Sequence, residues 1–169
     1  MRLETNSKQE KTLTMTVLMT PDMANFSGKV HGGSLLKLLD QVAYACAAKY
    51  CKNYVVTAAL DQVFFKQHVN VGELVTFYAR VNYVGRSSME VGVKAVAEHL
   101  CTYEKRHTTS CYFTMVAIGE DGKPIQVPPL QLETEDEHNW FKAAEIRKEL
   151  RKESLAKSQA LQGNDEDSF

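Results

Sequence analysis

The stretch Ala24–Asp40, with the sequence ANFSGKVHGGSLLKLLD, decides the fold of this chain. An irregular segment leads into a Gly-Gly pair and strong helix formers follow, so the pattern predicts a helix over about Gly33–Lys49. Apolar residues occupy most faces of that helix, and we expect the rest of the domain to enclose it. Asp40 nevertheless lies two turns inside it. A carboxylate in such surroundings is rare enough to indicate a chemical role.

Composition restricts the class of protein. The 169 residues suit one domain with a tail: we expect a flexible N-terminus at 1–11, a domain at 12–130, and a charged helical tail with a disordered end at 131–169. The net charge of −1 gives no overall attraction for nucleic acid or anionic lipid. The first twenty residues lack the apolar core of a signal peptide, and no later run could span a membrane. We expect a cytoplasmic protein with no nucleic-acid partner and no membrane insertion.

The four cysteines show no spacing typical of a metal site. Cys46 falls on the predicted helix, Cys111 lies in a strand-like run, and neither Cys51 nor Cys101 belongs to a C-x-x-C pair. In a reducing compartment we interpret all four as small hydrophobic residues rather than as zinc ligands or a structural disulfide.

Strand-like runs rich in β-branched and aromatic residues surround the helix. They are expected at Thr12–Val17, Val55–Phe65, Leu74–Val84, Met89–His99 and His107–Ile118. The turn GRSS joins the third run to the fourth, and a D-G turn signal follows the fifth, which favours antiparallel pairing. The fold class is therefore α+β, with a long central helix wrapped by a curved antiparallel sheet of about five strands, and not a parallel Rossmann type.

A charged C-terminal helix is expected beyond the prolines of KPIQVPP, at about Glu135–Ala160. Trp140, Phe141, Ala144 and Leu150 lie roughly on one stripe of it. We interpret it as a solvated helix that docks a few apolar residues on the body or on a partner. Its basic run RKELRKES, interleaved with acids, is a weak candidate for a membrane surface.

The Gly-Gly pair admits two interpretations. Gly32 and Gly33 leave backbone N–H groups unobstructed at the positive end of a helix dipole, where an anion or a developing oxyanion can bind. Alternatively, the pair only permits a tight entry into the helix.

Asp40 and Asn25 are the candidate reactive side chains. A partly desolvated Asp40 would be a better general base, although it could instead be a structural carboxylate paired with Lys37 or a main-chain group. Asn25 lies in the loop seven residues before Gly32 and could donate a hydrogen bond to a carbonyl or hold a water molecule. Asparagine in a loop can also be a plain turn residue.

The Gly-Gly pair and Asp40 are too far apart along the predicted helix to act together within one chain. Seven or eight residues separate the Gly-Gly pair from Asp40, which is about 10–12 Å along a helix. Both groups therefore reach one reacting carbonyl only if the helix start of one subunit faces the carboxylate of another. An active site on a dimer interface is the consequence.

The chain resembles the hotdog-fold acyl-CoA thioesterases, in particular the bacterial hexameric enzymes and the brain-type cytosolic acyl-CoA hydrolases. The resemblance spans about Thr12–Pro129. It rests on ANFSGKVHGGSLLKLLDQVAYACA, VVTAALDQVFF, VNVGELVTFYARVNYVGRSSMEV, SCYFTMVAI and GKPIQVPP, of which the first block is the most specific.

The resemblance implies a fold, an assembly and a reaction. Members of the family form dimers with continuous sheets, often arranged as trimers of dimers, and hydrolyse acyl-CoA to free fatty acid and coenzyme A. Asp40 matches the catalytic acid, which would activate a water molecule or attack the carbonyl itself. Asn25 matches the catalytic amide, and a backbone N–H of Gly32 or Gly33 matches the oxyanion donor. A thiolate leaves readily, so neither a metal nor a cofactor beyond the coenzyme A of the substrate is expected.

Further positions are candidate substrate contacts. Arg86 could pair with a phosphate of coenzyme A, with Ser87 and Ser88 as hydrogen-bond donors, although GRSS could also be a plain polar turn. The family places polar residues on the strand near the site, where this chain has Thr57, Asp61 and Gln62. One departure from the family pattern is His68, which stands in place of an expected proline.

Three other functions compete with a thioesterase. A hotdog dehydratase could use His31 with an acid, but its usual motifs are missing from the sequence. A non-catalytic sensor could bind acyl-CoA or a nucleotide, and a structural dimerisation module could keep the fold alone. Neither a receptor nor a structural module needs a buried base, so the combination of Asn25, the Gly-Gly pair and Asp40 favours the thioesterase.

Overall fold

The computed structural model describes residues 9–162. Residues 1–8 of the flexible N-terminus expected at 1–11, and the disordered end expected at 163–169, lie outside the described residues. The chain forms two compact units, one up to Gln131 and one from Leu132 onward, which we describe separately.

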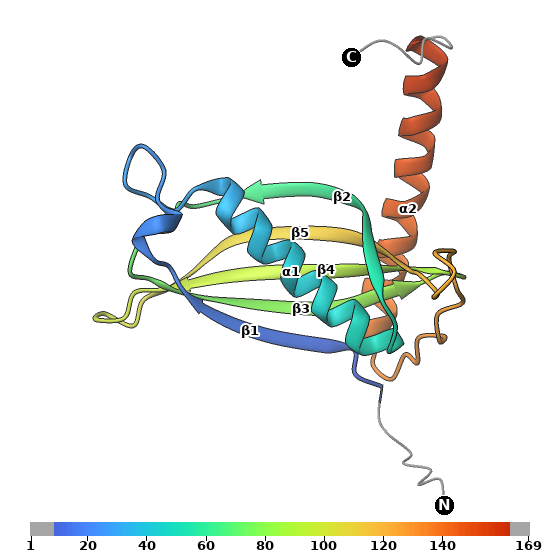
Figure 1. The fold of residues 1–169 in the computed structure, drawn as a ribbon, viewed down its shortest axis with the longest axis horizontal. Helices are drawn as coiled ribbons and strands as arrows, with labels where there is room; N and C mark the ends of the chain where they lie inside the picture. Colours follow the sequence, from blue (N-terminus) through green and yellow to red (C-terminus); the bar gives the residue numbers. More distant parts are fainter. Residues whose placement is uncertain (1–8, 163–169) are drawn as a thin grey trace, which may run out of the picture. The chain divides into compact units, whose positions relative to one another are not determined.

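The first unit is an antiparallel sheet with one long helix across it (Figure 1). Its elements are β1 (Thr12–Leu18), α1 (Gly32–Cys51), β2 (Val55–Phe65), β3 (Leu74–Val84), β4 (Ser88–Glu98) and β5 (Lys105–Ala117). The strands lie in the order β1-β3-β4-β5-β2, and every neighbouring pair is antiparallel. This confirms the α+β class and the five-stranded sheet that the sequence predicted.

The core lies between α1 and the sheet. On the helix, Leu35, Leu39, Val42 and Cys46 follow the spacing of one helical face, and all are buried. On the facing side of the sheet, alternate residues are buried against this helical face; on β4 they are Met89, Val91, Val93, Ala95 and Ala97. Burial raises the pKa of the Cys46 thiol, and of the Cys111 thiol on β5, to about 12, so both act as apolar core residues.

Within residues 9–162, no element covers the opposite side of α1. Lys37, Gln41 and Tyr44 are exposed, and Asp40 is only half-buried. The expectation that the domain encloses the helix on all sides, with a buried Asp40, is therefore wrong for one copy. The physical reason is that the sheet packs on one side of α1 only and ends at β2, an edge strand.

A buried ion pair fixes the segment between β2 and β3. Arg106 donates two hydrogen bonds to the Glu73 carboxylate, each 2.9 Å long, and one of 3.2 Å to the His68 carbonyl. The Asn70 N–H donates a further bond of 2.8 Å to Glu73, whose side chain is 2% exposed. Burial alone would raise the pKa of the Glu73 carboxyl, but these donors outweigh it and hold that pKa at about 2.

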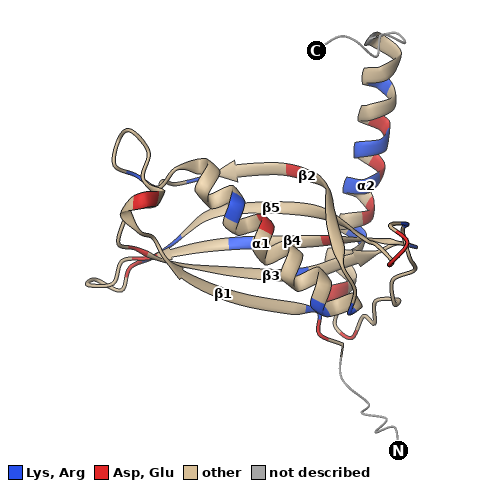
Figure 2. Cartoon of the chain, in the orientation of Figure 1, with Lys and Arg blue, Asp and Glu red and all other residues tan. Residues whose placement is uncertain are grey.

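The second unit is a charged helix, α2 (Glu135–Gln162). Its first turn is capped by the Thr134 hydroxyl, which accepts a hydrogen bond of 3.2 Å from the Glu137 N–H. Figure 2 shows basic and acidic residues interspersed along it, and two of them, Lys157 and Glu153, form an ion pair one turn apart. Neither α2 nor any other helix in residues 9–162 has the length and apolarity needed to cross a membrane.

The substitution Glu73→Gln tests the importance of the buried pair. It leaves Arg106 without its charged partner, so we expect the free energy of unfolding at pH 7 to fall by about 3 kcal/mol. The folded-state pKa lies below the ordinary 4.5, so this stabilisation is complete above pH 4.5 and disappears as the pH falls towards 2. Chemical denaturation of both proteins at pH 7 and at decreasing pH measures the difference.

The matched control is Glu98→Gln, because the ion pair of Glu98 with Lys105 is longer and more exposed. We expect that substitution to change the free energy of unfolding by less than about 1 kcal/mol. Equal losses in the two variants would show that the Glu73–Arg106 pair has no special importance.

Candidate functional site

The first turn of α1 is capped by a histidine. The Nδ1 atom of His31 accepts a hydrogen bond of 2.8 Å from the Gly33 N–H. A Cβ atom at Gly33 would lie 3.0 Å from that nitrogen, so a larger residue here would press on the His31 ring that makes the cap. Gly33 thus serves the tight entry into the helix. The Gly32 N–H has no recorded hydrogen-bond partner in residues 9–162 and is the donor of the pair that is open to a ligand.

The loop before α1 holds Asn25 by its side-chain oxygen. That oxygen accepts hydrogen bonds from the N–H and hydroxyl of Ser27, at 2.9 and 2.8 Å, and from the Lys29 N–H at 3.1 Å. The amide nitrogen of Asn25 bonds to no group within the described part of the chain. Asn25 is therefore a turn residue through its oxygen, and its NH₂ group remains available as a donor.

Asp40 is held by a neighbouring strand. Thr57, on β2, donates a hydrogen bond of 2.6 Å to its Oδ1 atom. Among the described residues, Lys37 forms no ion pair with Asp40, so the interpretation of a structural pair with that lysine does not apply. One carboxylate oxygen is thus oriented by Thr57, while Oδ2 has no recorded partner in the described part.

The rise of the helix separates Gly32 from Asp40. Asp40 follows Gly32 by eight residues, which corresponds to about 12 Å along α1. A carbonyl group cannot contact the Gly32 N–H and the Asp40 carboxylate of one chain at once. The structure brings Asp40 and Thr57 together, and the Ala24–Val30 bridge and a bond of 2.7 Å from the His31 N–H to the Met23 carbonyl hold the Asn25 loop at the start of α1.

A bulge in β2 shapes the region beside the helix start. The register with β5 shifts between Asp61 and Phe64, and Gln62 adopts a φ of +42°, a left-handed conformation. After the bulge the Phe65 ring lies over Gly32, at 3.7 Å from the position that a Cβ atom would take there. Asp61 and Gln62 are therefore at the turn of the strand, and the sequence did not show the bulge.

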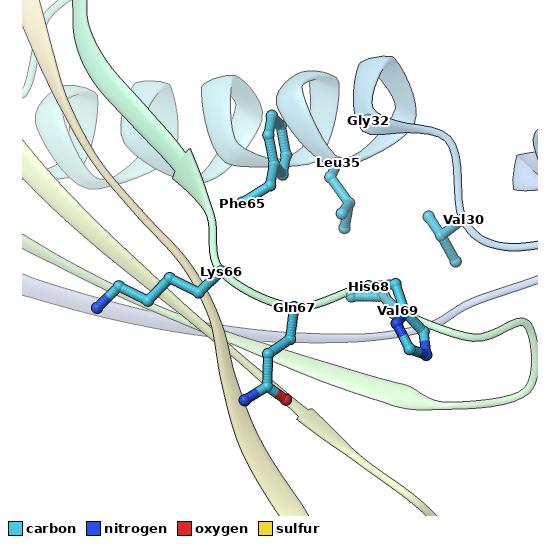
Figure 3. Close-up of a pocket in the computed structure, with 8 residues that line it drawn as sticks. All are labelled: Val30, Gly32, Leu35, Phe65, Lys66, Gln67, His68 and Val69. Carbon is cyan, nitrogen blue, oxygen red and sulfur yellow. The ribbon is translucent and has the colours of Figure 1, made fainter.

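A pocket of about 590 Å³ opens beside Gly32 (Figure 3). It is lined by Val30, Gly32, Leu35, Phe65, Lys66, Gln67, His68 and Val69. In Figure 3, Leu35 points down from the first turns of α1 and the Phe65 ring lies across the helix, whereas Lys66 and Gln67 point away from it. Of the pocket residues, only Gly32 and His68 were singled out from the sequence. The others were missed because the β2 bulge and the Arg106 hydrogen bonds that position them leave no local sequence pattern.

The proposed coenzyme A contacts lie at the other end of the sheet. Arg86, Ser87 and Ser88 stand at the turn between β3 and β4, and the Ser87 carbonyl accepts a bond of 2.9 Å from the Ala117 N–H at the end of β5. Ala117 pairs with Val55, which follows the last turn of α1. Since α1 has 20 residues, about 30 Å of helix separates that end from Gly32. Within one chain, the structure does not bring Arg86 to the helix start.

Comparison with known proteins places this site in a family context. A family model described as the thioesterase superfamily matches residues 27–101. The VdlD protein of Helicobacter pylori is 47% identical over 151 residues, which make up 89% of this chain and 86% of that protein. An uncharacterized acyl-CoA thioester hydrolase of Bacillus subtilis is 35% identical over 158 residues, or 94% of this chain and 92% of the relative.

Solved structures agree with the sequence relatives. An apo-hexameric acyl-CoA thioesterase aligns with a TM-score of 0.83 at 37% identity, over 88% of this chain and 94% of that one. The acyl-CoA hydrolase of Staphylococcus aureus, solved with butyryl coenzyme A, coenzyme A and coenzyme A disulfide, aligns with a TM-score of 0.80 at 29% identity, over 89% and 91%.

The Staphylococcus aureus enzyme has also been solved with single alanine replacements of an asparagine, an aspartate and a threonine. Its asparagine and aspartate are 15 residues apart, and its aspartate and threonine are 17 apart. The same separations relate Asn25, Asp40 and Thr57 in this chain.

Proposed function

Because the chain belongs to the thioesterase superfamily, among its acyl-CoA thioester hydrolases, we propose that it hydrolyses fatty acyl-CoA to free fatty acid and coenzyme A in a site shared by two copies. The observation that carries the proposal is the position of Asp40, held by Thr57 on the uncovered side of α1 and about 12 Å from the open Gly32 N–H. Each group suits one side of the same carbonyl, and only a second copy can bring them together.

Asp40 supplies the nucleophilic side of the reaction. Its free Oδ2 atom takes a proton from a water molecule, whose oxygen then adds to the thioester carbon. When the C–S bond breaks, this proton passes to the departing thiolate of coenzyme A, and the products are a free fatty acid and the thiol. Direct attack of the carboxylate on the carbonyl is the other route, which leads to an anhydride that water must cleave. In both routes Thr57 fixes the carboxylate and is a positioning residue.

Asn25 and Gly32 of the second copy supply the electrophilic side. The Gly32 N–H lies at the positive end of a 20-residue helix, where it can stabilise the charge that develops on the carbonyl oxygen. The free NH₂ group of Asn25 is a second donor for the same oxygen. The residue separations shared with the three substituted positions of the Staphylococcus aureus enzyme support this choice of groups.

A dimer is the smallest assembly that completes this site. Two identical sites arise from one two-fold axis, because each copy then offers Asp40 to one site and Gly32 to the other. A trimer of such dimers is our proposal for the full assembly, supported by the hexameric relative. Arg86, Ser87 and Ser88 remain proposed contacts for coenzyme A, as do Asp61 and Gln62 for the substrate beside the pocket.

Thiol release from acyl-CoAs of graded chain length tests the activity. We expect turnover by the wild type and a fall in kcat of about 10²–10⁴-fold for Asp40→Ala, because the general base is lost. Asp136→Ala, at an exposed carboxylate of α2, is the matched control and should keep wild-type activity. If the folded wild type releases thiol from no acyl-CoA, the enzyme proposal falls and a sensor that only binds acyl-CoA takes its place.

Two substitutions of Thr57 test its positioning role. Thr57→Val keeps the shape but loses the donor to Asp40, so we expect kcat to fall by about tenfold or more with little change in KM. Thr57→Ser retains a hydroxyl and should recover most of the rate. Steady-state kinetics and thermal unfolding of both variants give the comparison, and equal kcat values for valine and serine would contradict the role.

A further inference from the structure

One aromatic side chain is held in solvent beside the proposed site. Phe26 lies at the tip of the loop before α1 and is fully exposed. Burying such a ring would contribute about 2–3 kcal/mol, which the single chain does not gain. A large exposed aromatic group next to Asn25 therefore calls for a partner.

The loop that carries Phe26 has a defined shape. An antiparallel bridge between Ala24 and Val30 closes it, and the Asn25 N–H donates a bond of 2.6 Å to the Lys29 carbonyl. The Lys29 ammonium anchors the loop to the Asn70 side chain at 2.7 Å. With its backbone fixed in advance, the loop loses little conformational entropy when Phe26 is buried by a partner.

The two-fold symmetry of the proposed site shows where the loop of a second copy must lie. This step rests on the proposed function. If Gly32 of each copy faces Asp40 of the other, the two α1 helices run antiparallel. The numbers of facing residues then add to 72, as those of Gly32 and Asp40 do. Tyr44 lies one turn beyond Asp40, and the loop of the other copy lies beyond the start of its α1 (Figure 1), so the loop of one copy runs towards Tyr44 of the other.

An exposed pair of aromatic rings, Tyr44 and Tyr54, lies on this part of the surface. Tyr44 lies one turn after Asp40 on the uncovered side of α1 and is 40% exposed. Tyr54, before β2, packs edge-on against it with ring centroids 6.2 Å apart and is 60% exposed. The open faces of the two rings can accept a third aromatic ring.

We propose that Phe26 of each copy packs on the Tyr44–Tyr54 pair of the other and thereby docks the loop that presents Asn25 to the thioester. The occupant of the exposed aromatic pair is thus a second copy of this chain. Phe26 is a positioning residue, because it acts on the reaction only through Asn25. The same contact joins assembly of the dimer to completion of the site.

Cross-linking between differently tagged copies tests the contact directly. In full-length chains carrying Cys101→Ser, which removes the exposed thiol, one tag marks Phe26→Cys and the other marks Tyr44→Cys. After mixing by unfolding and reassembly, a short bis-maleimide should join the two tags. The control replaces Tyr44→Cys with Tyr78→Cys, at a residue that is 49% exposed on β3, outside α1 and the loop. A yield no higher than that of the control would overturn the proposal.

Kinetics give a second test that a purely structural role would not pass. We expect Phe26→Ala to lower kcat about tenfold with little change in KM, and Phe26→Trp to restore it, because an aromatic ring is retained. Phe26→Ala and Tyr44→Ala combined should cost no more than either alone, since both remove one contact. Fully additive losses would contradict the contact. Cross-linking without thiol release by the wild type would support the Phe26 contact and reject the enzyme proposal. Thiol release without cross-linking would support the enzyme proposal and reject the Phe26 contact.

Discussion

The rise of an α-helix, 1.5 Å for each residue, is the constraint on which this account depends. It fixes Gly32 and Asp40 at about 12 Å apart on α1, too far for one carbonyl to reach both in the same chain. The sheet, which covers one side of the helix only, leaves the other side available to a second copy. In the proposed dimer, the surface that completes the site is thus the side of α1 that the described part of a single copy leaves uncovered. In the proposed dimer, assembly also completes the catalytic site, because each copy supplies only half of the proposed groups.

Local patterns predicted most of the fold. Alternation of apolar residues gave the strands to within a few residues, and helix formers after the Gly-Gly pair gave α1. Enclosure of α1 was predicted wrongly, since an apolar helix can be covered by its own sheet or by another copy and composition does not distinguish the two. The Glu73–Arg106 pair was also missed, because it joins residues 33 positions apart and follows from tertiary packing alone.

The site was predictable where chemistry is tied to residue type and spacing. Asn25, Gly32 and Asp40 are candidates on that basis, and the distance between the last two predicts a site shared with a second subunit. The sequence did not show which glycine N–H is bonded to a cap, nor which atom of the Asn25 side chain is bonded within the loop. Histidine is an uncommon helix cap, so the bond from Gly33 to His31 could not be anticipated. Only the structure shows that Asn25 holds its loop by its side-chain oxygen, while its amide nitrogen bonds to no other described residue.

Reassembly of two inactive variants tests the shared site most directly. Asp40→Ala and Asn25→Ala chains, carrying different tags, are unfolded, mixed in equal amounts and refolded, and thiol release from an acyl-CoA is measured. Half of the dimers should be mixed, and each of these should contain one intact site of two, so about a quarter of the wild-type activity should return. A mixture as inactive as the separate variants, with mixed dimers shown by the tags, would contradict a site shared between two copies.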